Sequence, residues 1–265
     1  NFSDPGTGKT MPTLVYMGWL WREKGVRTIW AMPKTLLKKN WDEAVLWSGL
    51  KPEEIVIVDG PAKKRAKQMA QDAKIFIMGF RCFTDNWEQL VAIHPSISML
   101  VGDEWHLGFK SNGSQRTQSL KRFMARSEYL VAMTGTIIDG RLDTVYPLIE
   151  ICAPRAYPGG YPEFMMAHAI EDDTGRVVAW RNHARLAAVL KTMAVRHSFE
   201  EVYGKEAKVI IIERCTMSPL QYDCYKEFEE TALLELEDRW LSGELPGVNQ
   251  IRCRQLMEHP QTFGP

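Results

Sequence analysis

The sequence predicts an α/β protein with a doubly wound parallel sheet, and three observations support this fold class. Short apolar runs of strand length alternate with stretches of helical periodicity. Polar motifs follow directly after several of these runs, and parallel strands present ligand sites at their carboxyl ends. A glycine-rich loop ending in Lys9 precedes an apolar helix, which is the order found where a protein binds phosphate.

Glycine and proline mark the boundaries of the expected elements in the first half of the chain. Gly25 ends the first helix, Pro33 closes the first strand, and Asp59-Gly60-Pro61 closes the second. From periodicity we expect, in order, a helix over Met11–Arg22, a strand over Val26–Met32, an amphipathic helix over Leu36–Leu46, a strand over Ile55–Val58, a polar helix around Lys63–Lys67, and strands over Ile75–Met78, Ile97–Val101 and Tyr129–Met133.

The chain changes character after Pro154, where prolines and glycines give way to helical stretches. The expected elements here are helices around Pro162–Ala169 and Asn182–Met193, a strand over Lys208–Glu213, and a long helix over Gln221–Leu241. The long helix is predicted because apolar residues recur at helical spacing, namely Tyr225, Phe228, Ala232, Leu236 and Trp240. Such a stripe is typical of core packing.

Composition places the chain among globular proteins. It has 265 residues, of which 45% are hydrophobic, and its 33 basic residues balance 33 acidic ones, so a polyanion would have to meet a local basic patch. The five cysteines include no C-x-x-C pair, which argues against a zinc site or redox motif. No apolar run has the length of a membrane span. We expect an intracellular protein, located in the cytoplasm of a bacterium or phage-infected cell, or in a eukaryotic nucleus.

The loop at the start of the chain carries the first motif. Gly6, Thr7 and Gly8 let backbone N–H groups converge on phosphate oxygens, Lys9 would reach the β and γ phosphates, and Thr10 would offer a hydroxyl to Mg²⁺. Ser3 stands where the strict phosphate-loop pattern has its first glycine, and an accidental glycine-rich turn is the alternative. A buried strand should precede such a loop, so we expect the sequence to be a fragment of a longer protein.

Two further motifs follow apolar strands. Asp103 could hold Mg²⁺ through water, and Glu104 could orient and deprotonate an attacking water, although an acidic turn would look the same in isolation. His106 fits either a functional or a structural histidine. The hydroxyls of Thr134-Gly135-Thr136 could sense the γ-phosphate and relay its presence to a nucleic-acid-binding surface. Each motif is weak alone, and their order makes a joint signal for an ATP site.

At this point the chain resembles the Swi/Snf-type branch of the superfamily two helicase-like DNA translocases, over nearly its whole length. The stretches that carry the resemblance are Asp4–Thr10 (motif I), Ile29–Leu37 with Trp41 (motif Ia), Asp103–His106 (motif II), Met133–Ile138 (motif III), Leu142–Pro154, Met193–His197, Met217–Tyr222 and Arg254–Pro260. Gly102 and Trp105 depart from the apolar and small residues typical of the family at those places.

The resemblance implies a RecA-like fold that binds ATP and Mg²⁺ and acts on double-stranded DNA. It implies a RecA-like ATP-binding lobe over residues 1–153, a helical extension over 154–205 and the beginning of a second lobe, with a helical protrusion, over 206–265. It also suggests Lys34, Lys110, Asn112 and Ser114 as contacts to the DNA backbone, although such residues in loops are often only solvated.

The function expected from this resemblance is that of an ATP-dependent duplex-DNA translocase. The family's arginine-bearing motifs, which lie in the second lobe, have no counterpart in the sequence, so we expect the chain alone to hydrolyse ATP weakly or not at all. Two alternatives remain at this point. One is a strand-separating DNA or RNA helicase, which shares the four motifs, and the other is a catalytically degenerate nucleic-acid-binding module.

Overall fold

The computed structural model describes residues 1–138, 140–204, 216–231, 233–236, 239–242, 251 and 253–257. The chain divides into two compact units, Asn1–Glu206 and Ala207–Pro265, and each is described by itself. In the described residues, no helix combines the length and apolarity that a membrane crossing requires.

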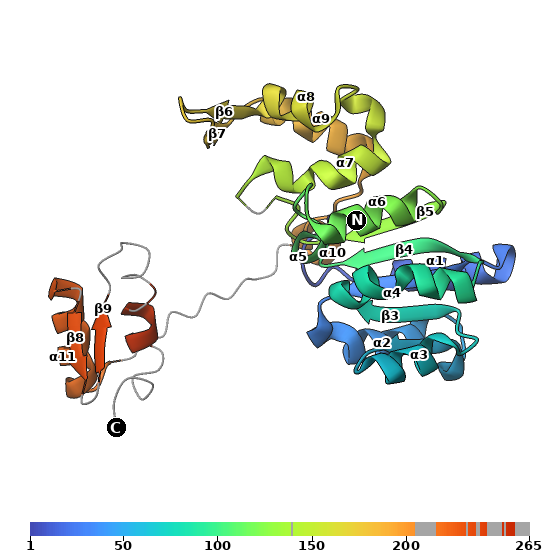
Figure 1. Ribbon diagram of the computed structural model, residues 1–265, viewed down its shortest axis with the longest axis horizontal. Helices are drawn as coiled ribbons and strands as arrows, with labels where there is room; N and C mark the ends of the chain where they lie inside the picture. Colours follow the sequence, from blue (N-terminus) through green and yellow to red (C-terminus); the bar gives the residue numbers. More distant parts are fainter. Residues whose placement is uncertain are drawn as a thin grey trace. The chain divides into compact units, whose positions relative to one another are not determined.

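The first unit is built on a parallel sheet of five strands (Figure 1). The strands are β1 Arg27–Met32, β2 Ile55–Val58, β3 Ile75–Gly79, β4 Ile97–Asp103 and β5 Tyr129–Met133, and their order across the sheet is β2-β3-β1-β4-β5. Every neighbouring pair runs parallel. The five strands predicted between residues 26 and 133 are therefore all present, and the predicted fold class is confirmed.

Helices cover both faces of the sheet because the buried strands send alternate side chains to opposite sides. Ile29 and Ala31 of β1 belong to one hydrophobic cluster, whereas Trp30 and Met32 belong to the other. Helices α1 (Thr10–Lys24) and α2 (Leu37–Trp47) pack on the Trp30 side. Helices α3 (Ala62–Met69), α4 (Phe80–Ile93) and α6 (Gln115–Met124) pack on the Ile29 side.

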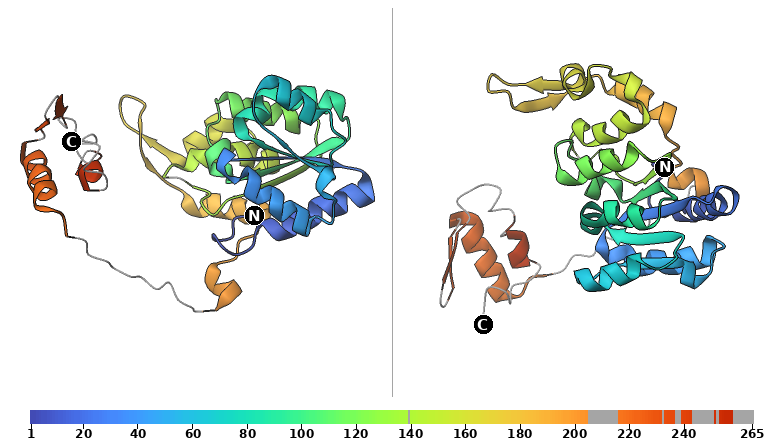
Figure 2. Two further views of the ribbon diagram at one scale, coloured as in Figure 1. Left: turned by 90° about the horizontal axis from the view of Figure 1, so that it is seen from below. Right: turned by 45° about the vertical axis from the view of Figure 1, so that its right-hand side comes forward.

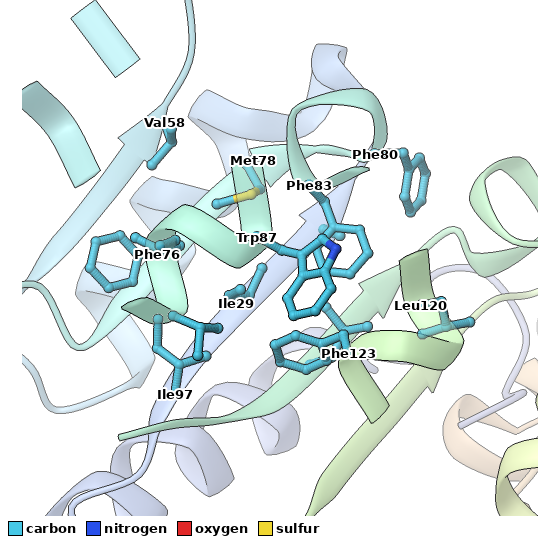
Figure 3. Close-up of a cluster of buried hydrophobic side chains, with 14 of the residues drawn as sticks. Ile29, Val58, Phe76, Met78, Phe80, Phe83, Trp87, Ile97, Leu120 and Phe123 are labelled. Carbon is cyan, nitrogen blue, oxygen red and sulfur yellow. The ribbon is translucent and has the colours of Figure 1, made fainter. Parts of the chain in front are cut away.

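An aromatic cluster joins α4 and α6 on the Ile29 side of the sheet. Figure 3 shows Phe83, Trp87 and Phe123 lying together. The Phe83 and Phe123 rings meet edge to face with centroids 5.8 Å apart, and those of Trp87 and Phe123 do so at 5.7 Å. This geometry suits the quadrupoles of aromatic rings and adds to the stabilisation from burying them.

The predicted glycine boundary of the first helix is also found. Gly25 follows α1 with φ of 66°, a left-handed conformation that favours glycine, and its N–H donates to the carbonyl of Trp21. The chain therefore turns sharply from α1 into β1.

Three helices after β5 form a separate hydrophobic cluster. They are α7 (Tyr146–Cys152), α8 (Gly160–His168) and α9 (His183–Met193), and the last two lie close to the predicted ranges. Short 3-10 turns, which occupy Lys34–Leu36, Pro52–Glu54, Leu142–Val145 and Pro154–Ala156, connect several elements of this unit. The unit ends with the short helix α10 (Phe199–Tyr203).

A hairpin between α8 and α9 was not predicted. Its strands are β6 (Ala169–Glu171) and β7 (Val177–Trp180), which pair antiparallel (Figure 2). The Asp172 carboxylate organises the turn by accepting hydrogen bonds from the backbone N–H groups of Thr174 and Arg176. The strands are too short and too exposed to show alternating hydrophobicity in the sequence.

In the second unit the long helix predicted over Gln221–Leu241 is wrong. Helix α11 covers Pro219–Thr231, and it is followed by strands β8 (Leu233–Leu236) and β9 (Arg239–Ser242), which pair antiparallel. A short apolar run fits a strand as well as a buried helical turn, so periodicity alone could not locate the end of the helix. The strand predicted over Lys208–Glu213 lies outside the described residues.

Candidate functional site

The phosphate loop lies between the first four residues of the chain and α1. Gly6 and Gly8 both have φ of 80°, a conformation that strongly favours glycine. The loop passes directly into the N-terminus of α1, which begins at Thr10. Backbone N–H groups at such a terminus, together with the helix dipole, favour an anion.

Lys9 already points into this loop. Its ammonium nitrogen donates to the backbone carbonyls of Ser3, at 2.8 Å, and Asp4, at 3.0 Å. An ammonium group has three N–H donors, so one remains for a phosphate oxygen. The lysine is thus held in place before any anion arrives.

Backbone pairing places this loop beside β5. The Asn1 nitrogen donates to the carbonyl of Ala132 at 2.6 Å, and the N–H of Thr134 donates to the carbonyl of Asn1 at 3.2 Å. These two bonds form the pattern of a parallel ladder in which Asn1 lies opposite Met133. The loop therefore leaves the same sheet edge as the ends of β4 and β5.

Asp103 ends β4 at this edge. Its carboxylate accepts hydrogen bonds from the Asn40 side chain, at 2.8 Å, and from the backbone N–H of Glu104, at 3.0 Å. Burial raises the pKa of Asp103 above its usual value, whereas the Asn40 bond and the positive charge of Lys9 act to lower it. Lys9 therefore lies close enough to Asp103 to affect its carboxylate electrostatically.

Asn40 was not predicted as a site residue. It lies on α2, and although it is polar it is only 2% exposed. A polar residue on the buried face of an amphipathic helix is the signal in the sequence that could have identified it.

Glu104 occupies the turn after β4 in an uncommon conformation. Its φ of 49° and ψ of 52° are left-handed, which costs free energy for a residue with a side chain. The turn leads into the short helix α5 (Trp105–Gly108), and the Glu104 side chain remains 41% exposed. A carboxylate presented in this way is open to water and to a ligand.

Gly102 and Trp105, the two residues that depart from the pattern of the resembled family, are complementary in size. A Cβ on Gly102 would lie 2.6 Å from an atom of the Trp105 ring. Trp105 is 2% exposed, and its ring also packs on Phe109 with centroids 4.7 Å apart. The missing side chain at Gly102 therefore makes room for the large one at Trp105, and neither change removes a polar group from the site.

A hydrogen-bond network links the ends of β4 and β5. Nδ1 of His106 lies 2.7 Å from Oγ1 of Thr134, and that hydroxyl donates its proton to the carbonyl of Thr136 at 3.0 Å. Because the hydroxyl proton is already used, Nδ1 of His106 must be the donor. His106 also lies near Glu104, with Nδ1 and Oε2 3.6 Å apart. Of the predicted coupling residues, His106 thus lies between Thr134 and the Glu104 carboxylate.

Gly135 brings the Thr134–Thr136 turn against the phosphate loop. A Cβ at this position would lie 2.9 Å from Cγ and Cδ of Pro5, too close for any ordinary contact. A pocket of about 340 Å³ opens between these loops, and its lining comes from Pro5, Pro33, Thr35, Leu36, Glu104, His106, Leu107, Gly135 and Thr136. All four motifs therefore contribute to one pocket.

The residues present fit ATP and Mg²⁺. Thr10 begins α1 with a half-buried side chain, and Asp103 lies near Lys9. Among the described residues there is no group of three or more His, Cys, Asp and Glu side chains placed to hold a metal ion. Mg²⁺ usually binds through one or two protein ligands together with water and substrate phosphates, and Thr10 and Asp103 are the residues that could supply those ligands here.

The four residues predicted to contact DNA lie in surroundings that are common on protein surfaces. Lys34 is 70% exposed and forms an ion pair with Asp59 at 3.0 Å. The Asn112 side chain accepts from Lys121, and the Ser114 hydroxyl caps α6 by accepting from the N–H of Thr117. Lys110 is exposed. Asn112 and Ser114 therefore have structural roles, and DNA contact at these positions stays a prediction.

The sheet, the glycine loop and the carboxylates that follow β4 define a RecA-like P-loop NTPase fold. The model of the SNF2-related domain family matches residues 2–262, and the chain belongs to this family. Its helicase-like, Swi/Snf-type character, expected from the motifs, is confirmed. No curated protein matches the chain.

A solved structure of a SWI2/SNF2 ATPase core shows the same fold. The SWI2/SNF2 ATPase core domain of Sulfolobus solfataricus has 19% identity and a TM-score of 0.57, and the match covers 98% of this chain and 52% of that one. The Hef helicase domain of Pyrococcus furiosus has 15% identity and a TM-score of 0.47, with 64% and 36% covered. The chain therefore spans about half, or less, of the proteins it matches.

Proposed function

We propose that this chain is the first RecA-like lobe of an ATP-dependent motor that translocates on duplex DNA. The observation that carries the proposal is that the Lys9 loop, the Asp103-Glu104 pair and the Thr134–Thr136 turn meet at one sheet edge. The family membership supports a helicase-like domain.

The chain's own residues have distinct roles in this proposal. Gly6, Thr7, Gly8 and Lys9 hold the phosphates of ATP, while Thr10 and Asp103 hold Mg²⁺, which neutralises charge on those phosphates when bound. Glu104 orients the attacking water and accepts its proton. His106 is held by its hydrogen bond to Thr134. Through this bond, a change at the nucleotide site on ATP binding or hydrolysis reaches the turn after β5.

The proposal includes a second RecA-like lobe of the same protein that completes the site. In phosphoryl transfer an arginine supplied to the γ-phosphate stabilises the charge of the transition state, and we propose that the second lobe supplies it. The two lobes would close when ATP binds and reopen after hydrolysis. This cycle would shift the protein's contacts along the DNA duplex.

The test of this function is the ATPase activity of the intact protein with duplex DNA, single-stranded DNA and RNA. We expect duplex DNA to stimulate hydrolysis most, and Glu104→Gln to lower kcat by about 10² to 10⁴ because general base catalysis is lost. Stimulation by RNA alone would contradict translocation on DNA. Unchanged turnover in Glu104→Gln would favour the degenerate binding module.

A further inference from the structure

A segment from the end of the first unit lies along the phosphate loop. We call residues Val195–Tyr203 the strap. The N–H of Phe2 donates to the carbonyl of Val195 at 2.8 Å, and the N–H of Asp4 donates to the carbonyl of His197 at 3.0 Å. The strap thus follows the chain that leads into the loop, and α10, which belongs to the strap, appears beside the chain start in Figure 1.

Side chains of the loop segment are tied to the same strap. The Ser3 hydroxyl accepts from the N–H of His197 at 3.0 Å, and the Asp4 carboxylate accepts from the N–H of Phe199 at 3.2 Å. Arg196 adds an ion pair with Asp4 at 3.6 Å. Ser3 and Asp4 are also the residues whose carbonyls hold the Lys9 ammonium. The strap and Lys9 are therefore fixed to one stretch of backbone.

Two aromatic residues of α10 reach the glycine of the loop. The Tyr203 hydroxyl donates to the carbonyl of Gly6 at 3.1 Å. The Phe199 ring lies 3.6 Å from the place a Cβ on Gly6 would occupy, and it packs against the Tyr203 ring, tilted by 41°, with centroids 4.7 Å apart. The helix that presents these rings is itself fixed by a capping box between Ser198 and Glu201.

The bond from Tyr203 sets the direction of a loop N–H. In a peptide group the C=O and the N–H of the next residue point in opposite directions. Holding the Gly6 carbonyl toward the strap therefore turns the Thr7 N–H the other way, and this N–H donates at 3.3 Å to the Asp4 carbonyl, which also accepts from Lys9. The bond from Tyr203 and the two bonds to the Asp4 carbonyl therefore hold the backbone of the loop in one conformation.

We propose that the strap positions the phosphate loop for nucleotide, with Tyr203 and Phe199 as positioning residues. This inference rests on the proposed function, because it concerns the same nucleotide site. Binding costs less when the loop is already ordered, so we expect the strap to strengthen nucleotide binding without contacting the reacting atoms.

The test measures the affinity of the full 265-residue chain for a fluorescent N-methylanthraniloyl ADP in the presence of Mg²⁺. Tyr203→Phe removes one hydroxyl and keeps the ring, and we expect Kd to rise about two- to tenfold. Phe199→Ala should also raise Kd. The matched control is Val202→Ala, which changes an exposed residue of the same helix and should leave Kd unchanged.

The possible results separate the strap from the nucleotide site itself. If the wild-type chain binds the fluorescent ADP, and both Tyr203→Phe and Phe199→Ala bind it with the same Kd as the wild type, the strap proposal is overturned. The proposed function then still stands. If the wild-type chain does not bind the probe, the proposed function fails. Tyr203→Phe is compared with the wild type by thermal unfolding, and a raised Kd at unchanged Tm supports positioning.

Hydrogen exchange gives an independent readout. Coupling between sites is reciprocal, so if the strap favours nucleotide binding, nucleotide must favour the docked strap. We expect saturation with ADP and Mg²⁺ to slow exchange at the N–H groups of His197 and Phe199, which bond to Ser3 and Asp4. Exchange at these amides that is unchanged or faster with nucleotide would contradict the proposal.

Discussion

At the scale of single residues, the site depends on a few close approaches that only particular side chains allow. Gly135 is the clearest case, since a Cβ there would meet the Pro5 ring, and Gly102 leaves room for Trp105 in the same way. Asp103 is held by Asn40, which orients its carboxylate. These contacts keep the loops that carry the motifs in fixed positions around one pocket.

Gly135→Ala is expected to destabilise the first unit by about 1–3 kcal/mol, because the new methyl group overpacks against Pro5. Thermal unfolding measures this loss. The matched control is Gly113→Ala, where a Cβ meets nothing within 4 Å, and it should change Tm little. Equal Tm values for the two variants would show that Pro5 and Gly135 are not in close contact.

Asn40→Ala tests the residue that the sequence did not reveal. Removing the amide takes away the 2.8 Å hydrogen bond that favours the charged form of Asp103, so the pKa of Asp103 should rise further. We expect weaker Mg²⁺-dependent nucleotide binding, with the larger loss at lower pH. Titration of binding against pH would detect this, and an identical pH profile in the variant would contradict the role given to Asn40.

At the scale of elements, the sequence predicts the parallel sheet well, and its errors lie in the two antiparallel hairpins that follow. Ile55–Val58 and Tyr129–Met133 form strands with the predicted bounds because apolar runs closed by glycine, proline or polar motifs admit few alternatives. The hairpin β6–β7 was missed because its short, mostly exposed strands lack periodicity. The end of α11 was missed because a short apolar run fits a strand as well as a buried helical turn. The strap could not be foreseen because its contacts join residues nearly two hundred positions apart.

The packing between α4 and α6 can be tested by Phe83→Ala. Phe83 is fully buried and meets Phe109 and Phe123 edge to face, so its loss should cost about 3–5 kcal/mol in the free energy of unfolding. Ile93→Ala, on the same helix but at a site 41% exposed, should cost far less. Denaturant unfolding of the two variants compares them, and similar losses would argue against the aromatic cluster as a main source of stability.

The α8 and α9 region should respond to acid through His168. This ring is buried, with Nε2 2.6 Å from the Tyr157 hydroxyl, and burial lowers the pKa of His168 below its ordinary value of 6.5. At a pH between the lowered pKa of His168 in the folded chain and its ordinary pKa of 6.5 in the unfolded chain, only the unfolded chain binds the proton. The free energy of unfolding therefore falls as pH drops through about 6.5. His168→Gln should flatten this dependence in unfolding measurements, and an unchanged profile would contradict the buried neutral ring.

At the scale of the whole molecule, each hydrophobic cluster of the described residues lies within one of the two compact units. The clusters on the two faces of the sheet and the cluster of α7, α8 and α9 lie within the first unit, and the cluster of Phe228 and Leu256 lies within the second. We therefore expect residues 1–206 to fold on their own and to keep the nucleotide site. A truncated chain that fails to fold, as judged by cooperative thermal unfolding, would contradict this.

The central claim is that Lys9 and Asp103 belong to one nucleotide site, and Mg²⁺-dependent binding of fluorescent ADP to the wild type and two variants tests it most directly. Lys9→Ala should weaken binding by about ten- to a hundredfold through loss of a charged hydrogen bond, with or without Mg²⁺. Asp103→Asn should remove mainly the gain in affinity that Mg²⁺ provides. Binding that neither variant alters would contradict the account.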